Sequence, residues 1–90
     1  MGTAIIKLKI MPKSPDSDLN EIQEKAKNII SKITSSDINT QKEPIAFGLN
    51  ALYLIFTIDE SQSIDEAQEE ISNLDSVSSA EVVDFRRALG

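Results

Sequence analysis

The 90-residue sequence contains no cysteine and no histidine. Without cysteine, neither a disulfide nor a thiolate metal site can form. Without histidine, the chain lacks the commonest general base and a frequent metal ligand, so none of its serines can be activated by an imidazole. We therefore expect no nucleophilic catalysis, and the sequence points to no catalytic residue, no cofactor and no bound metal.

Long hydrophobic runs are also missing. The longest uninterrupted apolar stretch, Ala51 to Phe56, is far shorter than the roughly 20 residues that a membrane-spanning helix needs. The start of the chain, MGTAIIKLKI, has neither a basic beginning nor a small-residue cleavage pattern, so it does not read as a signal peptide. These features predict one soluble, cytoplasmic domain over residues 1–90, without a membrane partner.

Positive charge is scarce in the second half of the chain. The net charge is −6, but residues 1–45 are nearly neutral, whereas residues 46–90 carry two arginines against nine acidic residues. No basic residue occurs between Lys42 and Arg86. An acidic surface disfavours nucleic acid, whose phosphates require basic contacts, so we expect no direct nucleic-acid binding. The same surface suits a partner with a basic face, or it simply keeps a small domain soluble.

Glycine is missing where a phosphate-binding loop would need it. The segment after the first predicted strand contains Pro12 and Pro15 in place of a run of free N–H groups, which argues against an acylphosphatase. The acidic pairs are only a weak signal of general acid/base chemistry, because their positions predict solvated side chains. They are an equally weak signal of a loosely bound hard cation, because the spacing of a calcium-binding loop is missing. The adjacent acidic pairs are Asp59–Glu60, Asp65–Glu66 and Glu69–Glu70.

The first half of the chain predicts a strand followed by a helix. Alternating apolar residues predict the strand over Thr3–Met11, with one buried face. Asp18 and Glu21 have the spacing of a capping box, which predicts the start of the helix. The apolar stripe of this helix consists of Leu19, Ile22, Ala26, Ile29, Ile30 and Ile33. A stripe with this helical spacing must be covered by a sheet.

Two strands, a helix and a final strand are predicted after this helix. Asp37–Glu43 has the pattern of a polar edge strand, and Leu49–Ile58, apolar on both faces, has that of a central strand. Ser63 and Glu66 predict a second capping box at the start of a second amphipathic helix. The last strand is predicted over Ser76–Phe85. Its inward set is either Ala80 with Val82, or Val77 with Val83 and Phe85.

The resulting order, βαββαβ, predicts a ferredoxin-like α+β fold. Right-handed crossovers place both helices on one face of a four-stranded antiparallel sheet. The other face is predicted to be open and to expose Ile5, Tyr53 and Ile55. This fold serves many unrelated functions, so function has to be argued from particular residues.

Two features stand out on this scaffold. Phe47 and Gly48 lie in a predicted turn, where the glycine permits a bulge or tight turn and the ring either packs on a neighbouring strand or contacts a partner. Arg86 and Arg87 are the only cations after Lys42 and lie close to the C-terminus. They form either a frayed tail that offsets the acidic surface or a second contact with a partner.

Three segments resemble archaeal elongation factor 1-beta. They are IIKLKIMPKSPDSDL near the start, EPIAFGLNAL in the middle and VSSAEVVDFRR near the end. The resemblance covers essentially the whole chain, and PIAFGL followed by a long apolar strand is its most specific part. It implies a ferredoxin-like fold and a guanine nucleotide exchange factor for elongation factor 1-alpha. The chain is also similar to the C-terminal exchange domain of the larger eukaryotic factor.

The resemblance further implies which residues meet the GTPase. The family's proline-x-x-aromatic-glycine segment contacts the partner through its aromatic ring, which here is Phe47, followed by Gly48. In the eukaryotic relatives a lysine next to last in the chain acts at the magnesium site of the partner. Here Leu89 is next to last, Arg87 is the nearest basic candidate and Arg86 is the second.

From this resemblance we expect a protein that is monomeric when free, binds elongation factor 1-alpha with GDP, and promotes the entry of GTP. Phe47 and Arg87 are predicted at opposite ends of the sheet, so they should contact different regions of the partner. The alternative is an ACT-like regulatory or interaction module that dimerises through the open face around Ile5, Tyr53 and Ile55.

Overall fold

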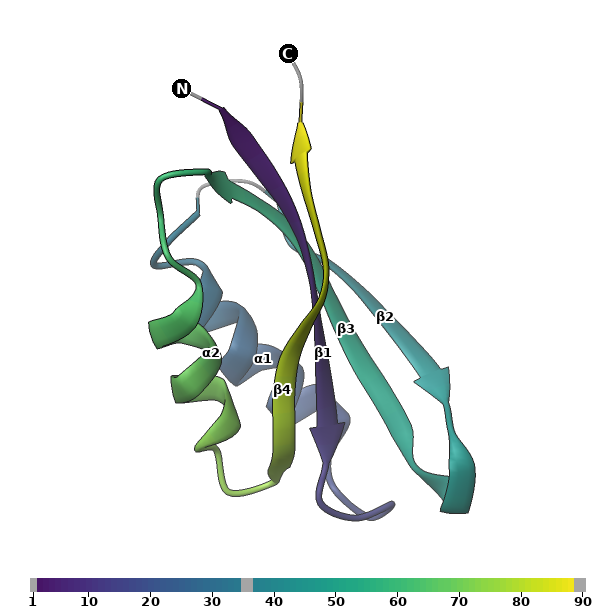
Figure 1. Cartoon of the computed structure of the whole chain (residues 1–90). Helices are drawn as coiled ribbons and strands as arrows, with labels where there is room; N and C mark the ends of the chain where they lie inside the picture. Colours follow the sequence, from purple (N-terminus) through teal and green to yellow (C-terminus); the bar gives the residue numbers. More distant parts are fainter. Residues whose placement is uncertain (1, 35–36, 89–90) are drawn as a thin grey trace.

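The computed structural model describes residues 2–34 and 37–88 of the chain and has the predicted order of strands and helices (Figure 1). In chain order the elements are β1 (Thr3–Pro12), α1 (Leu19–Ile30), β2 (Asn39–Pro44), a tight turn (Ala46–Gly48), β3 (Asn50–Asp59), α2 (Asp65–Ser72) and β4 (Val77–Ala88).

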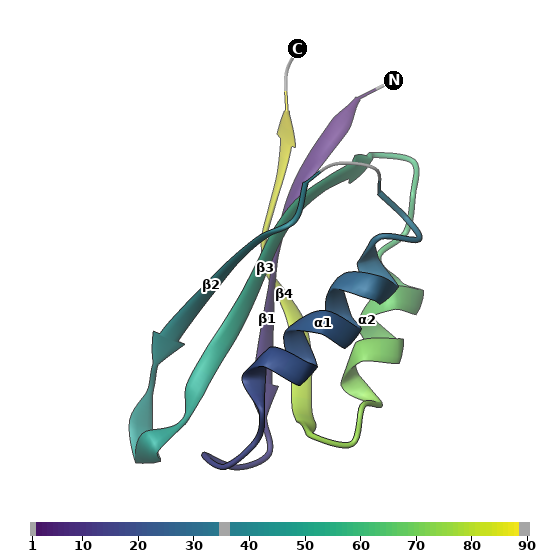
Figure 2. The same ribbon diagram turned by 180° about the vertical axis from the view of Figure 1, so that it is seen from behind.

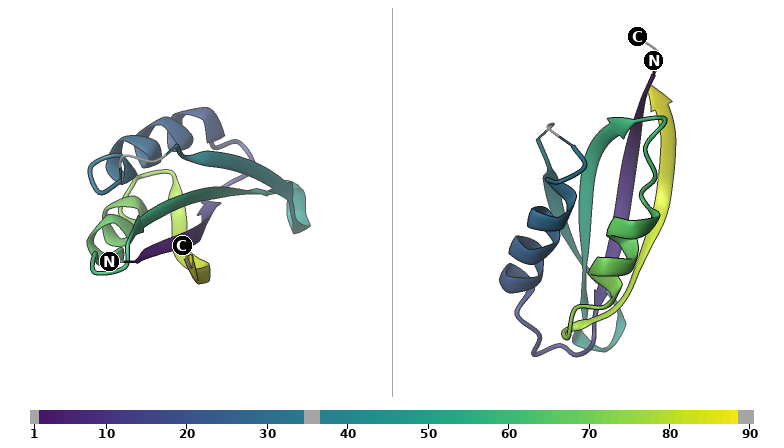
Figure 3. Two further views of the ribbon diagram at one scale, coloured as in Figure 1. Left: turned by 90° about the horizontal axis from the view of Figure 1, so that it is seen from above. Right: turned by 90° about the vertical axis from the view of Figure 1, so that its left-hand side faces the viewer.

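The four strands form one antiparallel sheet in the order β2-β3-β1-β4. Both helices lie on the same face of this sheet, to the left of the strands in Figure 1 and to their right in Figure 2, and both are at the left in the left view of Figure 3. The prediction of a ferredoxin-like α+β fold is therefore confirmed. At the end where the two termini lie, β1 and β4 run beyond the helices (Figure 1). On β4 the side chains at that end stay exposed, and Phe85 is 51% exposed.

The core lies between the sheet and the two helices. The β1 side chains that were predicted to face inward are all fully buried: Ala4, Ile6, Leu8 and Ile10. Strand β3 and the helices complete this layer with Leu52, Leu54, Phe56, Ile58, Ile22, Ala26, Ile30, Ala67 and Ile71. Each large aliphatic side chain in such a layer contributes about 1.5–3 kcal/mol. This layer holds the helices against one face and leaves the other face open.

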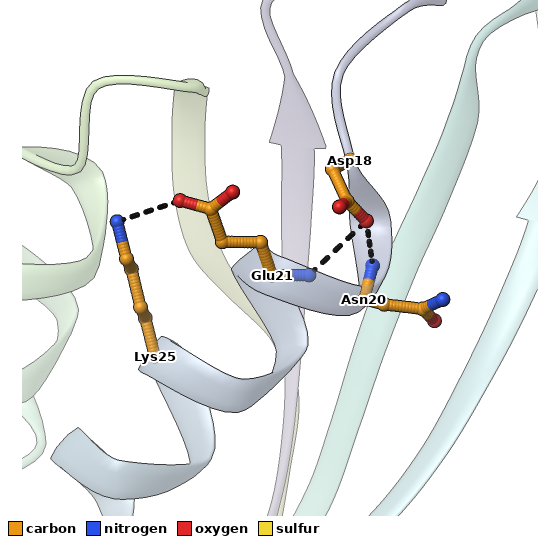
Figure 4. A network of polar contacts seen from close by, with 4 residues as sticks. All are labelled: Asp18, Asn20, Glu21 and Lys25. Atoms are coloured by element: carbon orange, nitrogen blue, oxygen red, sulfur yellow. Dashed lines mark hydrogen bonds and ion pairs between the residues drawn. The ribbon is translucent and has the colours of Figure 1, made fainter.

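Helix α1 begins where the capping box predicts, but only half of the box forms. The Asp18 carboxylate accepts hydrogen bonds from the backbone N–H groups of Asn20 (3.0 Å) and Glu21 (3.3 Å) (Figure 4). The Glu21 carboxylate does not complete the box; it pairs with Lys25, 2.9 Å away and one turn further along. The hydrogen bond from Lys25 to Glu21, together with their opposite charges, raises the pKa of Lys25. The i,i+4 ion pair has thus replaced the predicted return contact.

The second predicted capping box is wrong. Helix α2 begins at Asp65, and the Ser63 hydroxyl accepts a hydrogen bond from the Asp65 N–H (3.2 Å), not from the N–H of Glu66. Ile64 takes the capping position and supplies no side-chain hydrogen bond. Asp65 and Glu66 lie in the first turn, where their negative charges interact favourably with the positive end of the helix dipole.

The predicted boundaries differ from the observed ones by a few residues. Helix α1 ends at Ile30, although Ile33 still packs against the core. Strand β2 begins at Asn39, and β4 continues past the predicted end at Phe85 to Ala88. Of the helices in the described residues, neither is long and apolar enough to cross a membrane.

Strand β4 does not keep one alternation along its length. Its register against β1 shifts twice, once beside Leu8 and once beside Pro12. At these places Val83 and Ser78 have no direct partner in β1, which is the geometry of a β-bulge. Each bulge inserts one residue and exchanges the inward and outward sets.

Of the two inward sets that the sequence left open, the first, Ala80 with Val82, is confirmed, and the second is right only for Val77. Val77 and Ala80 are buried, and Val82 packs against the core. Val83 and Phe85 are 46% and 51% exposed, so the prediction that they are buried in the core is wrong, although Phe85 lies opposite the buried Ile6.

The open face of the sheet exposes less apolar surface than predicted. Tyr53 is only 9% exposed, because Lys7 places its ammonium group 4.7 Å from the centre of the ring and Lys9 is the direct cross-strand partner of the tyrosine. Ile55 is half-buried and Ile5 is 39% exposed. The prediction of an exposed Tyr53 is therefore wrong.

Candidate functional site

The β2–β3 hairpin ends in a tight turn, the hairpin tip (residues 45–49), at the end of the molecule opposite the termini (Figure 1). The Ile45 N–H donates to the Leu49 carbonyl (2.8 Å), and the Leu49 N–H donates to the Ala46 carbonyl (3.3 Å). Between these bonds, Phe47 and Gly48 have positive φ angles of 64° and 74°. Two consecutive left-handed residues form the kind of turn that follows the twist of a β-hairpin.

Phe47 adopts a conformation that its side chain does not favour. A left-handed backbone (φ 64°, ψ 28°) costs a residue with a Cβ roughly 1–2 kcal/mol, and asparagine, aspartate or glycine usually occupies this turn position. Burial does not offset that cost, because Phe47 is 91% exposed. The interpretation that the ring packs on a neighbouring strand is therefore wrong. The contact with a partner stays a prediction.

Gly48 is required by its backbone angle rather than by crowding. A methyl group in place of its hydrogen would come no closer than 3.9 Å to any atom outside the adjoining residues, and that atom belongs to the ring of Pro15. The φ of 74° is what disfavours any other residue. The contact with Pro15 also shows that the loop between β1 and α1 lies beside the hairpin tip.

Arg86 and Arg87 belong to a paired strand, so the interpretation of a frayed tail is wrong. Arg86 lies opposite Ile5 of β1, and Arg87 lies opposite Ala4. Because successive residues of a strand point to opposite faces, Arg86 lies on the open face and Arg87 on the face that carries the helices.

Each arginine has a carboxylate of the same chain as its neighbour. The Nε of Arg86 lies 3.1 Å from Asp84 Oδ2, and the Nε of Arg87 lies 3.7 Å from Glu60 Oε2. Both arginine side chains are nevertheless 75% exposed. Either guanidinium is therefore accessible to a partner molecule.

The structure does not bring Phe47 and the arginines together. Strand β3 runs from Asn50, next to the hairpin tip, to Asp59, which pairs with Thr3 at the other end of the sheet. At roughly 3.3 Å per residue this strand spans about 30 Å, and the longest dimension of the molecule is 42 Å. The candidate site consists of two contact regions at opposite ends of the sheet, as the element order predicted.

Comparison with known proteins identifies the family. Residues 5–88 match the EF-1 guanine nucleotide exchange domain. The chain belongs to this family. It is 41% identical over 90 residues to elongation factor 1-beta of Methanobrevibacter smithii, covering 99% of this chain and 100% of that one. It is 39% identical over 88 residues to elongation factor 1-beta of Methanosarcina barkeri, covering 97% and 99%. The predicted resemblance to archaeal elongation factor 1-beta is confirmed.

A solved structure supports the fold of this exchange domain independently. The de novo designed protein Foldit4 superposes with a TM-score of 0.64 at 12% sequence identity, covering 98% of both chains. At this identity the likeness concerns the fold alone.

One exposed residue of the exchange domain escaped the sequence analysis. Phe85 lies opposite Ile6, two residues from Arg87 and on the same face of β4. It is 51% exposed because it lies where the sheet runs beyond the helices. One of the two alternation sets assigned Phe85 to the core; the bulge at Val83 does place it opposite the buried Ile6, on the face of the helices, but no helix covers it there. The adjacency of an aromatic and two arginines in the sequence was the available signal.

The turn next to Arg87 is extensively hydrogen-bonded. Asp59 Oδ1 accepts hydrogen bonds from the Ser61 N–H (2.9 Å) and hydroxyl (2.8 Å), and Gln62 Oε1 accepts one from the Asp59 N–H (3.2 Å). The bonds from the Ser61 N–H and hydroxyl lower the pKa of Asp59. In the described residues no three acidic side chains are arranged to hold a metal ion. The Asp59–Glu60 pair thus orders a turn.

Proposed function

We propose that this chain binds the GDP form of elongation factor 1-alpha and promotes exchange of GDP for GTP. Membership of the EF-1 guanine nucleotide exchange family supports this proposal. The observation that carries it is Phe47, which is 91% exposed on a left-handed backbone. An aromatic side chain that raises the energy of its own turn and adds little to the core is best explained by a pocket on a partner.

The exchange requires no covalent step. In a GTPase, Mg²⁺ bridges the nucleotide phosphates and the protein, so GDP is held tightly. A factor speeds GDP release if it binds the open state of that pocket more tightly than the closed state. By linkage, if the factor lowers the affinity of the GTPase for GDP, GDP lowers the affinity of the GTPase for the factor by the same ratio. Entry of GTP then displaces the factor, which forms and breaks no bond and is in this sense not an enzyme.

The two contact regions have different tasks in this proposal. Phe47, with Gly48 holding the turn, docks the hairpin tip on the partner. Arg87 reaches the nucleotide site from the other end of the sheet, about 30 Å away at roughly 3.3 Å per residue. A guanidinium presents a planar fork of donors that suits phosphate oxygens, whereas it is a poor substitute for a compact metal ion. We assign this task to Arg87 before Arg86, because Arg87 shares its face with the exposed ring of Phe85.

We also propose that the free chain is a monomer. The ACT-like alternative needs an apolar open face, but Tyr53 on that face is only 9% exposed. Lys7 and Lys9 lie beside the tyrosine on the same face, so the surface around its ring is charged rather than apolar. Light scattering should give the mass of one chain. A tight dimer would instead favour the regulatory module.

Release of a fluorescent GDP from elongation factor 1-alpha tests the proposal directly. In excess GTP, the release rate should rise with the concentration of this chain and then saturate. Phe47→Ala should raise the half-saturating concentration at least tenfold, because buried aromatic anchors dominate binding energy. Ile5→Ala, which trims an exposed apolar residue of the open face, is the control and should leave it nearly unchanged. A wild-type chain that leaves GDP release at its spontaneous rate would overturn the proposal.

A further inference from the structure

Arg87 forms an ion pair with Glu60, an acidic residue whose side chain was predicted to be solvated. Its Nε lies 3.7 Å from Oε2 of Glu60, which belongs to the turn after β3. Strand β1 lies between β3 and β4, so this ion pair bridges over the start of β1. Among the described residues, Glu60 is the one acidic side chain that pairs with Arg87.

The position of the Glu60 carboxylate is set by its surroundings. The Glu60 N–H donates to the carbonyl of Gly2 (3.0 Å), which ties the turn to the start of β1. The hydrogen bonds of Asp59 with Ser61 and Gln62 hold the same turn. The Glu60 side chain passes over Gly2 so closely that a methyl group there would lie 2.6 Å from Oε2. A residue without a side chain at position 2 therefore leaves the path from Glu60 to Arg87 open.

We infer that Glu60 is a positioning residue for Arg87. It holds the guanidinium at the end of the sheet, on the face of Phe85, where it meets the anionic nucleotide site of the partner. The contact is made by the Nε of Arg87 and the side chain is 75% exposed, so the guanidinium keeps donors for phosphate oxygens. A long side chain that is already held in the free protein loses less freedom on binding. This inference rests on the proposed exchange function.

Glu60→Gln tests the inference because it keeps the shape of the side chain and removes its charge. In the GDP-release assay it should lower the maximal rate about two- to fivefold, the range expected for losing an exposed ion pair. The half-saturating concentration should stay the same, since docking depends on Phe47. The matched control is Glu70→Gln on α2, which removes the same charge from an exposed position and should behave as wild type.

A double-mutant cycle shows whether Glu60 acts through Arg87. Glu60→Gln should have no further effect in an Arg87→Gln background. Gly2→Ala offers an independent route, because it displaces the Glu60 carboxylate without removing it and should also lower the maximal rate. A wild-type rate for Glu60→Gln, a faster rate, or an equal loss in the Arg87→Gln background would overturn the inference.

An NMR measurement on the free chain separates this inference from the exchange function. The Nε–H signal of Arg87 should shift with Glu60→Gln and stay in place with Glu70→Gln. If the wild-type chain fails to release GDP, the proposed function fails, whatever this signal does. If the wild type does release GDP but the Arg87 signal ignores Glu60→Gln, the positioning role alone is wrong.

Discussion

Arg86 and Arg87 are neighbours in the chain but extend from opposite faces of the sheet, opposite Ile5 and Ala4 of β1. Arg86 pairs with Asp84 of its own strand, whereas Arg87 pairs with Glu60 across the end of the sheet. The two guanidinium groups therefore start from opposite faces of the sheet and have different neighbours.

This arrangement predicts unequal effects for the two arginines. Arg87→Gln should lower the maximal rate of GDP release about tenfold, because a charge-assisted hydrogen bond to a phosphate is worth about 1.5–3 kcal/mol. Arg86→Gln should change it less than twofold. Stopped-flow measurement at saturating factor gives both values. Equal losses for the two variants would contradict the assignment of Arg87.

Phe47→Asn should separate stability from function. Asparagine tolerates a left-handed backbone and favours this turn position, so the free energy of unfolding should rise by about 0.5–1 kcal/mol. The variant should also lose the docking strength that Phe47 provides. Urea unfolding and the GDP-release assay measure the two effects on the same preparation. A less stable variant would show that Phe47 contributes to the fold.

Gly48→Ala should destabilise the free chain by about 1–2 kcal/mol, since alanine at a φ of 74° is strained although space is available. Gly48→Asn should destabilise the chain less than Gly48→Ala does, because asparagine adopts a left-handed backbone more readily than alanine. Urea unfolding of the two variants side by side provides the comparison. Equal stability of wild type and Gly48→Ala would mean that the turn readily changes its conformation.

Phe85→Ala should leave the fold nearly intact, because the ring is 51% exposed and lies beyond the helices. If Phe85 contacts the partner together with Arg87, Phe85→Ala should raise the half-saturating concentration in the GDP-release assay about threefold or more. Thermal unfolding serves as the control for stability. A large drop in melting temperature with unchanged exchange would assign Phe85 to the core after all.

Asp59 should show a pH dependence that follows from its hydrogen bonds with Ser61. These bonds lower the pKa of Asp59 in the folded protein. The stability they contribute is complete above the ordinary pKa of an aspartate, and it is lost as the pH falls through the lowered pKa of the folded state. Ser61→Ala removes the hydroxyl bond but keeps the bond from the backbone N–H of residue 61. The pKa of Asp59 should therefore rise only part of the way toward its ordinary value. NMR titration of the carboxyl group measures it, with Ser63→Ala as the control.

The sequence predicted the fold well where a local pattern was sufficient. The alternation in β1 identified its buried face, and the helical stripe after Asp18 identified α1, because a side chain's direction follows from its own backbone period. The pair Phe47–Gly48 was recognised as a turn from its glycine. The fold therefore followed from periods of two and 3.6 residues and from turn residues.

Contacts between distant segments were harder to predict. The second capping box failed because Ser63 bonds to Asp65 rather than to Glu66. Tyr53 was expected to be exposed, but Lys7 from another strand covers it. A pattern along one segment carries no information about which long side chain of a neighbouring strand will fold over it.

By itself the sequence determined the strands, the helices and the inward face of β1, because these depend on each segment's own spacing of apolar residues. It also determined the family, whose segments run through almost the whole chain. Only the tertiary structure decided that Phe85 is exposed, that Arg86 and Arg87 point apart, and that Glu60 meets Arg87. The end of the helix layer leaves Phe85 exposed, the pairing of β4 with β1 beyond Phe85 separates the two arginines, and the strand order brings Glu60 to Arg87; all three depend on how whole elements pack and pair.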